Sequence, residues 1–224
     1  MNSAPCCLRN SVCAPVRLFL ASSNPGKLAE YRALARAGLS LAGEQVTIEL
    51  ELLPGFESLP AFDENAPTFA ENATGKALHY SRSFDGLVFA DDSGLVVPAL
   101  GGAPGVLSAR YAGPGASSAE RNAKLLHELR GKSGRERVAY FVCAIALAQR
   151  GQAKAIVTGR VDGEILRAPR GDRGFGYDPV FYVPQLGAGF AEISEQEKNE
   201  RSHRGLAFRK LLAFLSYDSL TSQP

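Results

Sequence analysis

Hydrophobic and polar positions along this chain follow two periods, which predict strands interleaved with helices. Apolar or alternating runs bounded by turn residues indicate β-strands. These runs are residues 16–21, 46–52, 87–90, 138–148, 154–161 and 180–183. The run 138–148 joins the next near Arg150-Gly151, which predicts an antiparallel hairpin, and Asp162-Gly163 is expected to turn the chain after it.

Apolar residues at helical spacing separate several of these strands. One helix is predicted over residues 28–37, with Gly38 at its end. Three others follow Ser/Thr-x-x-Glu capping boxes, at residues 68–71, 117–120 and 194–197. A last helix begins at Ser202-His203. The pattern predicts an α/β fold, with a mixed twisted sheet flanked by helices and a single domain over residues 16–220.

Composition and charge exclude some classes of partner. The chain has 224 residues, of which 45% are hydrophobic and 21% are charged, as in ordinary globular proteins. Its net charge of +2 does not favour nucleic acid or an anionic membrane surface. The longest apolar run, residues 138–148, is too short to span a bilayer. We therefore expect neither nucleic-acid nor membrane partners.

The cysteines and the first residues bear on the compartment. Cys6, Cys7 and Cys13 lie near the N-terminus and Cys143 lies in an apolar run, without a Cys-x-x-Cys pair that would indicate zinc. Residues 1–15 lack the apolar core and the cleavage site of a secretory signal. We expect them to form a disordered tail, and we expect the protein in the reducing cytoplasm.

The first candidate for chemistry is an acidic segment. The apolar run 87–90 leads into Asp91-Asp92-Ser93-Gly94, which we expect at the end of that strand. Two adjacent carboxylates repel each other unless a cation or a proton separates them. Mg²⁺ is the simplest hard cation for such oxygens, and it usually binds together with phosphates. The alternative is a solvated turn that contains two aspartates.

A small polar loop is the second candidate. Residues 22–27 connect an apolar strand to a helix, a layout in which backbone N–H groups and the helix dipole face an anion. Lys27 adds a positive charge. The loop is not a Walker A motif, because Ala21 and Leu28 stand where that motif requires glycine and Ser or Thr. A connection without function is the alternative.

Further polar or aromatic groups lie in other segments. Asn72 and Lys76 share one helix face, for which a solvated surface is the alternative. Residues 174–177 combine two aromatic rings with two glycines, suited to stacking a base or to burial in a hairpin. His203 and Arg204 open the last helix, where cations oppose the helix dipole unless an anion lies nearby.

Five segments in this order resemble the inosine triphosphate pyrophosphatase family, the bacterial pyrophosphatases of non-standard purine nucleoside triphosphates. Together they extend over roughly residues 16–215. Ser22-Ser23 departs from the Thr-Gly that the family often has there, which keeps a hydroxyl and loses a glycine. The matching segments are residues 22–27, 68–73, 90–113, 174–179 and 202–205.

The resemblance implies a reaction and the residues that perform it. ITP, dITP or XTP is hydrolysed to the monophosphate and pyrophosphate with Mg²⁺, in the cleft between two lobes of a homodimeric protein. Asp92 is implied as the proton acceptor and as a metal ligand, with Glu64 or its neighbour Asp63 as the second ligand. Substrate-binding roles are implied for Ser22, Ser23, Asn24, Pro25, Gly26, Lys27, Lys76, Ser93, Phe175, Gly176, Tyr177, Asp178, Lys198, His203 and Arg204.

Two other functions stay open at this point. One is a pyrophosphatase that removes other modified nucleotides, and the other is a nucleotide-binding protein without turnover. An assay of purine and pyrimidine triphosphates with detection of pyrophosphate would separate all three.

Overall fold

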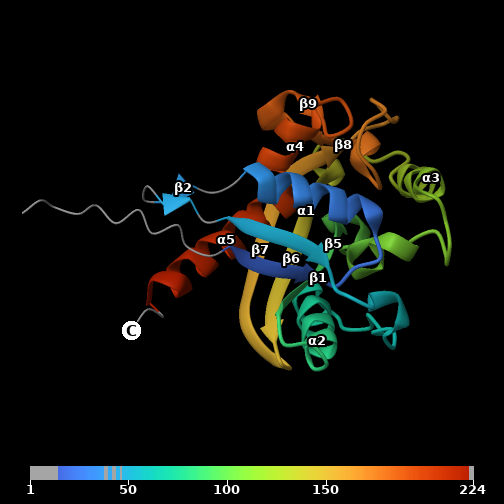
Figure 1. Cartoon of the computed structure of the whole chain (residues 1–224). Coiled ribbons are helices and arrows are strands. Elements are labelled where there is room, and N and C mark those ends of the chain that lie inside the picture. The colour runs from blue at the N-terminus through green and yellow to red at the C-terminus, as the bar shows by residue number, and fades with distance from the viewer. Residues whose placement is uncertain (1–14, 38–39, 42–43, 46, 222–224) are drawn as a thin grey trace, which may run out of the picture.

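A mixed seven-stranded sheet with helices on both faces forms the protein (Figure 1). The computed structural model describes residues 15–37, 40–41, 44–45 and 47–221. Predictions for residues 1–14, Gly38 and Val46 therefore lie outside the described residues. The helices are α1 (Pro25–Ala37), α2 (Phe69–Ser81), α3 (Ser118–Glu128), α4 (Glu195–Arg201) and α5 (His203–Thr221). The strands are β1 (Val16–Leu20), β2 (Ser40–Leu41), β3 (Glu44–Gln45), β4 (Ile48–Leu52), β5 (Leu87–Val96), β6 (Val138–Gln149), β7 (Gln152–Ile165), β8 (Phe181–Val183) and β9 (Ala188–Gly189).

The strand order β4-β1-β5-β6-β7-β8-β9 confirms the expected mixed sheet. β1 pairs in parallel with β4 and β5, and every later neighbour is antiparallel. β2 and β3 form a separate pair. The β6–β7 hairpin turns at Arg150 and Gly151, whose φ angles of 50° and 74° suit a tight two-residue turn.

Two strands are longer than the sequence suggested. β7 runs to Ile165 and contains Asp162-Gly163, so the expected turn there is wrong. Gly163 faces β8. A Cβ atom at this position would lie 2.4 Å from the main-chain carbonyl oxygen of Tyr182, so the glycine permits close packing of the two strands and does not form a turn. β5 likewise continues through Asp91-Asp92-Ser93-Gly94 to Val96, because β6 pairs with it along this length.

The helices cover both faces of the sheet, over the antiparallel strands β6 and β7 as well as over β1 and β5. α1 and α5 pack on one face, where Tyr31 and Phe208 contact Phe89. α2 packs on the other face with Ala73 and Ala77, and Figure 1 shows α1 and α2 on opposite sides of the strands. Small side chains permit this close approach of helix and sheet.

A third apolar cluster lies on the opposite half of the long strands. Leu95, Phe141 and Ile165 pack there with Leu125 of α3 and Phe181 of β8. The apolar residues of β5 thus belong to different clusters before Asp91 and after Gly94. The polar segment of β5 marks the boundary between two lobes, as the sequence resemblance implied.

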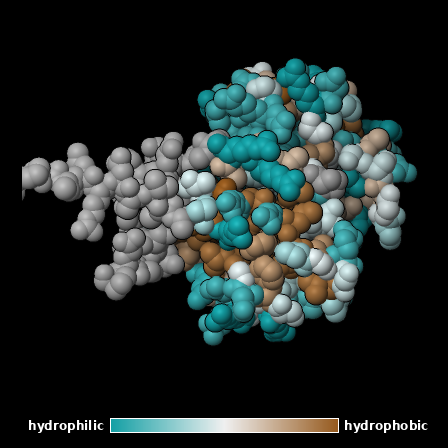
Figure 2. Space-filling model, in the orientation of Figure 1, coloured by the Kyte–Doolittle hydropathy of each residue, from teal (hydrophilic) through white to brown (hydrophobic). Residues whose placement is uncertain are grey.

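Surface features complete the fold. Figure 2 shows apolar surface across the middle of one face, below α1, where the edge strand β4 presents Leu52 with 40% exposure.

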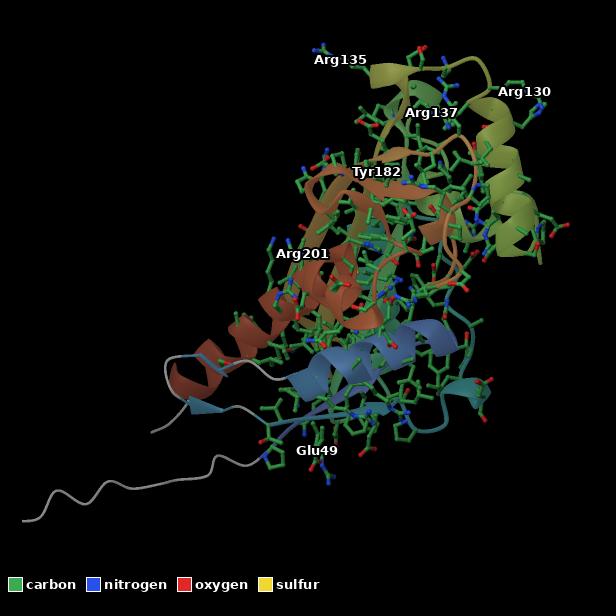
Figure 3. The ribbon with its side chains drawn as sticks, turned by 90° about the horizontal axis from the view of Figure 1, so that it is seen from above. Glu49, Arg130, Arg135, Arg137, Tyr182 and Arg201 are labelled. Atoms are coloured by element: carbon green, nitrogen blue, oxygen red, sulfur yellow. The ribbon has the colours of Figure 1, made fainter. Side chains whose placement is uncertain are left out.

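In the second lobe, the buried Arg137 guanidinium donates to the carbonyls of Leu129, Ile165 and Leu166, which connects the end of α3 to the end of β7 (Figure 3). In the described part of the chain, no helix has both the length and the apolar composition that crossing a bilayer requires.

Candidate active site

A cavity of about 510 Å³ opens between the two lobes, at the carboxyl end of β1. β1 ends at Leu20, and its last bond to the neighbouring strand runs from the Ala21 N–H to the Phe89 carbonyl. β5 continues beyond this point, and its residues 92–94 line the cavity together with the loop of residues 22–24. A crevice where parallel strands end is the usual binding place in open α/β sheets.

Most of the expected site residues line this one cavity. Pro25, Gly26 and Asp63 do not line it. Gly26 instead lies beside the Phe175 ring, in a neighbouring cavity. The expected residues in the lining are Ser22, Ser23, Asn24, Lys27, Glu64, Lys76, Asp92, Ser93, Phe175, Gly176, Tyr177, Asp178, Lys198, His203 and Arg204.

Strand geometry separates the two aspartates that the sequence places side by side. Successive residues of β5 point to opposite faces. Asp92 points toward α2, where the Asn72 amide donates to its carboxylate at 3.0 Å. Asp91 points toward α1 and α5. The expectation that both carboxylates lie at a solvent-facing strand end is wrong, since both are buried within a paired strand.

The Asp92 carboxyl is buried and has a raised pKa. Burial, to 6% exposure, is the main reason that the pKa of this carboxyl is raised to about 6. The hydrogen bond from Asn72 opposes the shift, and the negative charge of Glu64 adds to it. A carboxylate with a pKa near the working pH combines a useful deprotonated fraction with basicity.

Asp91 is a residue of this region that sequence reasoning left without a role. Its carboxylate lies 2.9 Å from the Lys27 ammonium and 3.7 Å from Nε of Arg204. Its main-chain oxygen accepts hydrogen bonds from Lys76 at 3.1 Å and from Lys27 at 3.4 Å. Burial opposes ionisation of Asp91, but the charges of Lys27 and Arg204 outweigh it and hold the pKa below its usual value. The two-residue period of β5 was the signal that could have identified it.

Glu30 on α1 is the second such residue. Its carboxylate lies 2.7 Å from the Lys198 ammonium and also pairs with the Arg204 guanidinium. Lys198 lies 2.6 Å from Asp178 as well. These pairs join into one buried chain of alternating charge beneath the cavity. Its members, in order, are Lys27, Asp91, Arg204, Glu30, Lys198 and Asp178.

The loop before α1 differs from the expected phosphate cradle. The Asn24 side-chain oxygen accepts from the N–H groups of Gly26 at 2.9 Å and Lys27 at 3.2 Å. Asn24 therefore caps the helix, which begins at Pro25 rather than at residue 28. Because those two N–H groups are occupied, this segment offers side-chain donors to the cavity: the hydroxyls of Ser22 and Ser23, the Asn24 amide and the Lys27 ammonium.

Of the two rings of the aromatic loop, that of Phe175 is exposed and that of Tyr177 is buried. Phe175 is 37% exposed, and the Lys198 ammonium lies 4.7 Å from its centroid. Tyr177 packs in the core, and its hydroxyl donates to the Ser108 carbonyl at 2.9 Å. Asp178 fixes the loop by accepting from the Phe175 N–H at 2.7 Å.

The opening of α5 also departs from the charge pattern expected. His203 stacks on Phe141 with a centroid separation of 4.6 Å. Burial and the neighbouring Arg204 charge hold the pKa of this histidine well below its usual value, so the ring is neutral. Arg204 is therefore the cation at this terminus, and Glu30 and Asp91 are the anions that balance it.

The carboxylates can also be compared as metal ligands. Glu64 shares the cavity with Asp92 and pairs with Lys76, whereas Asp63 pairs with Asn65 outside the cavity. Within the described ranges, no group of three or more His, Cys, Asp and Glu side chains is arranged to hold a metal. Mg²⁺ often binds through only one or two carboxylates, together with substrate phosphates and water. The mutual repulsion of Asp92 and Glu64 fits such a two-carboxylate site.

Comparison with known proteins identifies the family. The model of the Ham1 family matches residues 18–214. The chain belongs to the Ham1 family. This agrees with the resemblance that the five sequence motifs indicated.

Relatives of this Ham1-family protein cover nearly all of it. The dITP/XTP pyrophosphatase of Geobacillus kaustophilus is 48% identical over 195 residues, which are 87% of this chain and 91% of the relative. The dITP/XTP pyrophosphatase of Burkholderia pseudomallei is 48% identical over 204 residues, 89% of this chain and 93% of the relative. A solved HAM1 protein from Coxiella burnetii superposes with a TM-score of 0.77 at 43% identity, covering 90% of this chain and 99% of that one.

Proposed function

We propose that this protein hydrolyses non-standard purine nucleoside triphosphates (ITP, dITP and XTP) to the monophosphate and pyrophosphate, and so clears them from the nucleotide pool. One observation is the main support. A buried carboxylate with a raised pKa, Asp92, shares a cavity with cations from segments far apart in the sequence. The names of the relatives, dITP/XTP pyrophosphatases, support the same substrate class.

The chemistry follows from the positions of these groups. Asp92 would accept a proton from the water that attacks the α-phosphorus. The bond from that phosphorus to the bridging oxygen then breaks, and the electron pair leaves with pyrophosphate. Lys27 and Lys76, which meet at the Asp91 carbonyl, would neutralise the charge that develops on the departing oxygens. Mg²⁺ held by Asp92 and Glu64 would supply further neutralisation and would acidify the attacking water.

The deciding experiment is an assay of purified protein against a panel of triphosphates, with pyrophosphate and orthophosphate detected separately. We expect pyrophosphate release from ITP, dITP and XTP, with far slower release from ATP and the pyrimidine triphosphates. Preference for a modified pyrimidine would favour a pyrophosphatase for other modified nucleotides. Tight ITP binding without any product would favour a nucleotide-binding protein without turnover.

Removal of metal should stop the reaction. With EDTA in excess, the rate of pyrophosphate release from dITP is expected to fall to the uncatalysed rate, and excess Mg²⁺ should restore it, because two carboxylates alone repel the triphosphate. The control is Mg²⁺-saturated EDTA, which should leave the rate unchanged. Activity that survives complete chelation would contradict the metal assignment.

The raised pKa of Asp92 has a measurable consequence. In metal-free protein the carboxyl should lose its proton as the pH rises through about 6, as ¹³C chemical shifts of labelled aspartate would report. Metal competes with that proton, so the affinity for Mg²⁺ should increase across the same pH range and level off above it. Titration near the ordinary value of 3.8 would show that burial and Glu64 do not act on this group as described.

The assembly expected from the family resemblance can be tested separately. We propose that residues 16–220 form one domain and that two copies associate as a cytoplasmic homodimer, with no nucleic-acid partner. The exposed apolar edge at β4, with Leu52, is a surface that could be covered in this way. Light scattering should then give twice the chain mass of 23.8 kDa, and a mass of one chain would contradict the homodimer.

A further inference from the structure

A separate cavity of about 400 Å³ lies at the C-terminal end of α3. Three arginines and one histidine line it, and no carboxylate does. These side chains are His127, Arg130, Arg137 and Arg167. Figure 3 shows Arg130 and Arg137 at the same end of the molecule. This arginine cavity shares no lining residue with the active-site cavity.

Arg137 is the buried arginine of this cavity, with 7% exposure. Its guanidinium donates to three main-chain carbonyls, and no carboxylate of the described residues pairs with it. A guanidinium has five N–H donors, so one N–H on Nη1 and one on Nη2 are left over. A buried charge without a counter-ion is costly. Arg204, the other buried arginine in the described part of the chain, pairs with Glu30 and Asp91.

The neighbouring arginines add to the unbalanced charge. Burial and the positive charge of Arg167 both lower the pKa of Arg137. Among the residues that the structure describes, neither Arg130 nor Arg167 pairs with a carboxylate, and both are exposed. Like charges around one cavity repel each other unless an anion lies between them. An anion from solution would relieve the repulsion and would balance the buried charge.

We propose that the arginine cavity binds a phosphate group, either of inorganic phosphate or pyrophosphate or of a nucleotide. The planar fork of a guanidinium donates two parallel hydrogen bonds to such a group. Three arginines are also better balanced by a phosphate, which carries about two negative charges at neutral pH, than by a carboxylate, which carries one. The volume is within the range of small-molecule sites. Because the two cavities are separate, this proposal does not rest on the proposed function.

The test is calorimetric titration of the full chain with inorganic pyrophosphate, inorganic phosphate and IMP, at fixed ionic strength. EDTA is present, to remove the metal through which the active site is proposed to hold phosphates. Wild type is expected to bind pyrophosphate. In Arg167→Gln and in Arg130→Gln its Kd should rise about 10- to 100-fold, the effect of one hydrogen bond between charged groups. Any binding that persists at the active-site cations should be equal in wild type and both variants.

The matched control is Arg135→Gln, because Arg135 is exposed on the same segment as Arg137 but does not line the cavity (Figure 3). It should leave the Kd unchanged. The melting temperature gives a second measurement. Wild type should melt higher in phosphate than in chloride of equal ionic strength, because a bound anion stabilises the folded state. This difference should shrink in Arg167→Gln, whose melting temperature in chloride also reports whether the variant folds.

The ligands distinguish the two sources of phosphate. Tighter binding of IMP than of inorganic phosphate would support the site and assign it to nucleotides, and tighter binding of pyrophosphate than of IMP would support it and assign it to the free anion. Absence of binding in wild type, or the same Kd in wild type and both cavity variants, would overturn the proposal. An equal loss in Arg135→Gln would also overturn it, because general surface charge would then explain the binding.

Discussion

Replacing Asp92 by Asn is expected to lower kcat for dITP by at least about 100-fold, the lower end of what loss of a general base costs. Asparagine has nearly the same shape and can still bond to Asn72, but it cannot accept the proton of the attacking water. Substrate should still bind, because the cations that line the cavity remain. Single-turnover release of pyrophosphate and calorimetric binding of dITP measure the two effects separately.

The matched control is Asp162→Asn, an exposed carboxylate of β7 that pairs with Arg160 and does not line the cavity. It should retain wild-type turnover. If Asp92→Asn kept its turnover within a few-fold of wild type, another group would have to be the base.

Glu30→Ala is expected to destabilise the fold by about 3–5 kcal/mol, the cost of removing one partner from a buried ion pair. Glu30 balances both Lys198 and Arg204, and its loss would leave two buried cations with less compensation. Burial opposes ionisation of Glu30, but those two charges hold its pKa below the usual value. Its stabilising effect is therefore present above pH 4.5 and is lost as the pH falls through the lower folded-state pKa. Urea unfolding at pH 7 and at pH 4 would measure both effects.

Glu49→Ala provides the comparison, because Glu49 lies on the outer strand β4 and forms an exposed pair with Arg17 (Figure 3). An exposed pair contributes at most about 1 kcal/mol. Equal losses of stability in the two variants would mean that the buried charge chain does not support the fold.

Local signals in the sequence determined much of the architecture. Thr68 accepts a hydrogen bond from the Glu71 N–H, and the capping boxes at Ser117 and Ser194 form as expected, because a cap depends only on residues within one turn. The alternation of apolar and polar residues in β4, and the apolar runs in β1, β6 and β7, predicted these four strands correctly. The family motifs were equally readable, since each is a short contiguous segment.

The ends of elements were less predictable, because partners far along the chain decide them. Pairing with β6 carries β5 through Asp91 and Asp92 to Val96, and pairing with β6 and β8 carries β7 through Asp162. A sequence window contains none of these neighbours. The expected turns after Ala90 and at Asp162 failed for this single reason.

By itself, the sequence determined which residue types are present for the chemistry and on which local element most of them lie. The tertiary structure decided which face each side chain occupies and which charge it meets. The continuation of β5 sends Asp91 and Asp92 to opposite sides of the sheet, so Asp91 pairs with the cations and the pKa of Asp92 is raised to about 6. Glu30 gains its partners only when α1, α4 and α5 pack together, because its ion pairs with Lys198 and Arg204 span 168 and 174 residues of chain and depend on folding, not on sequence spacing.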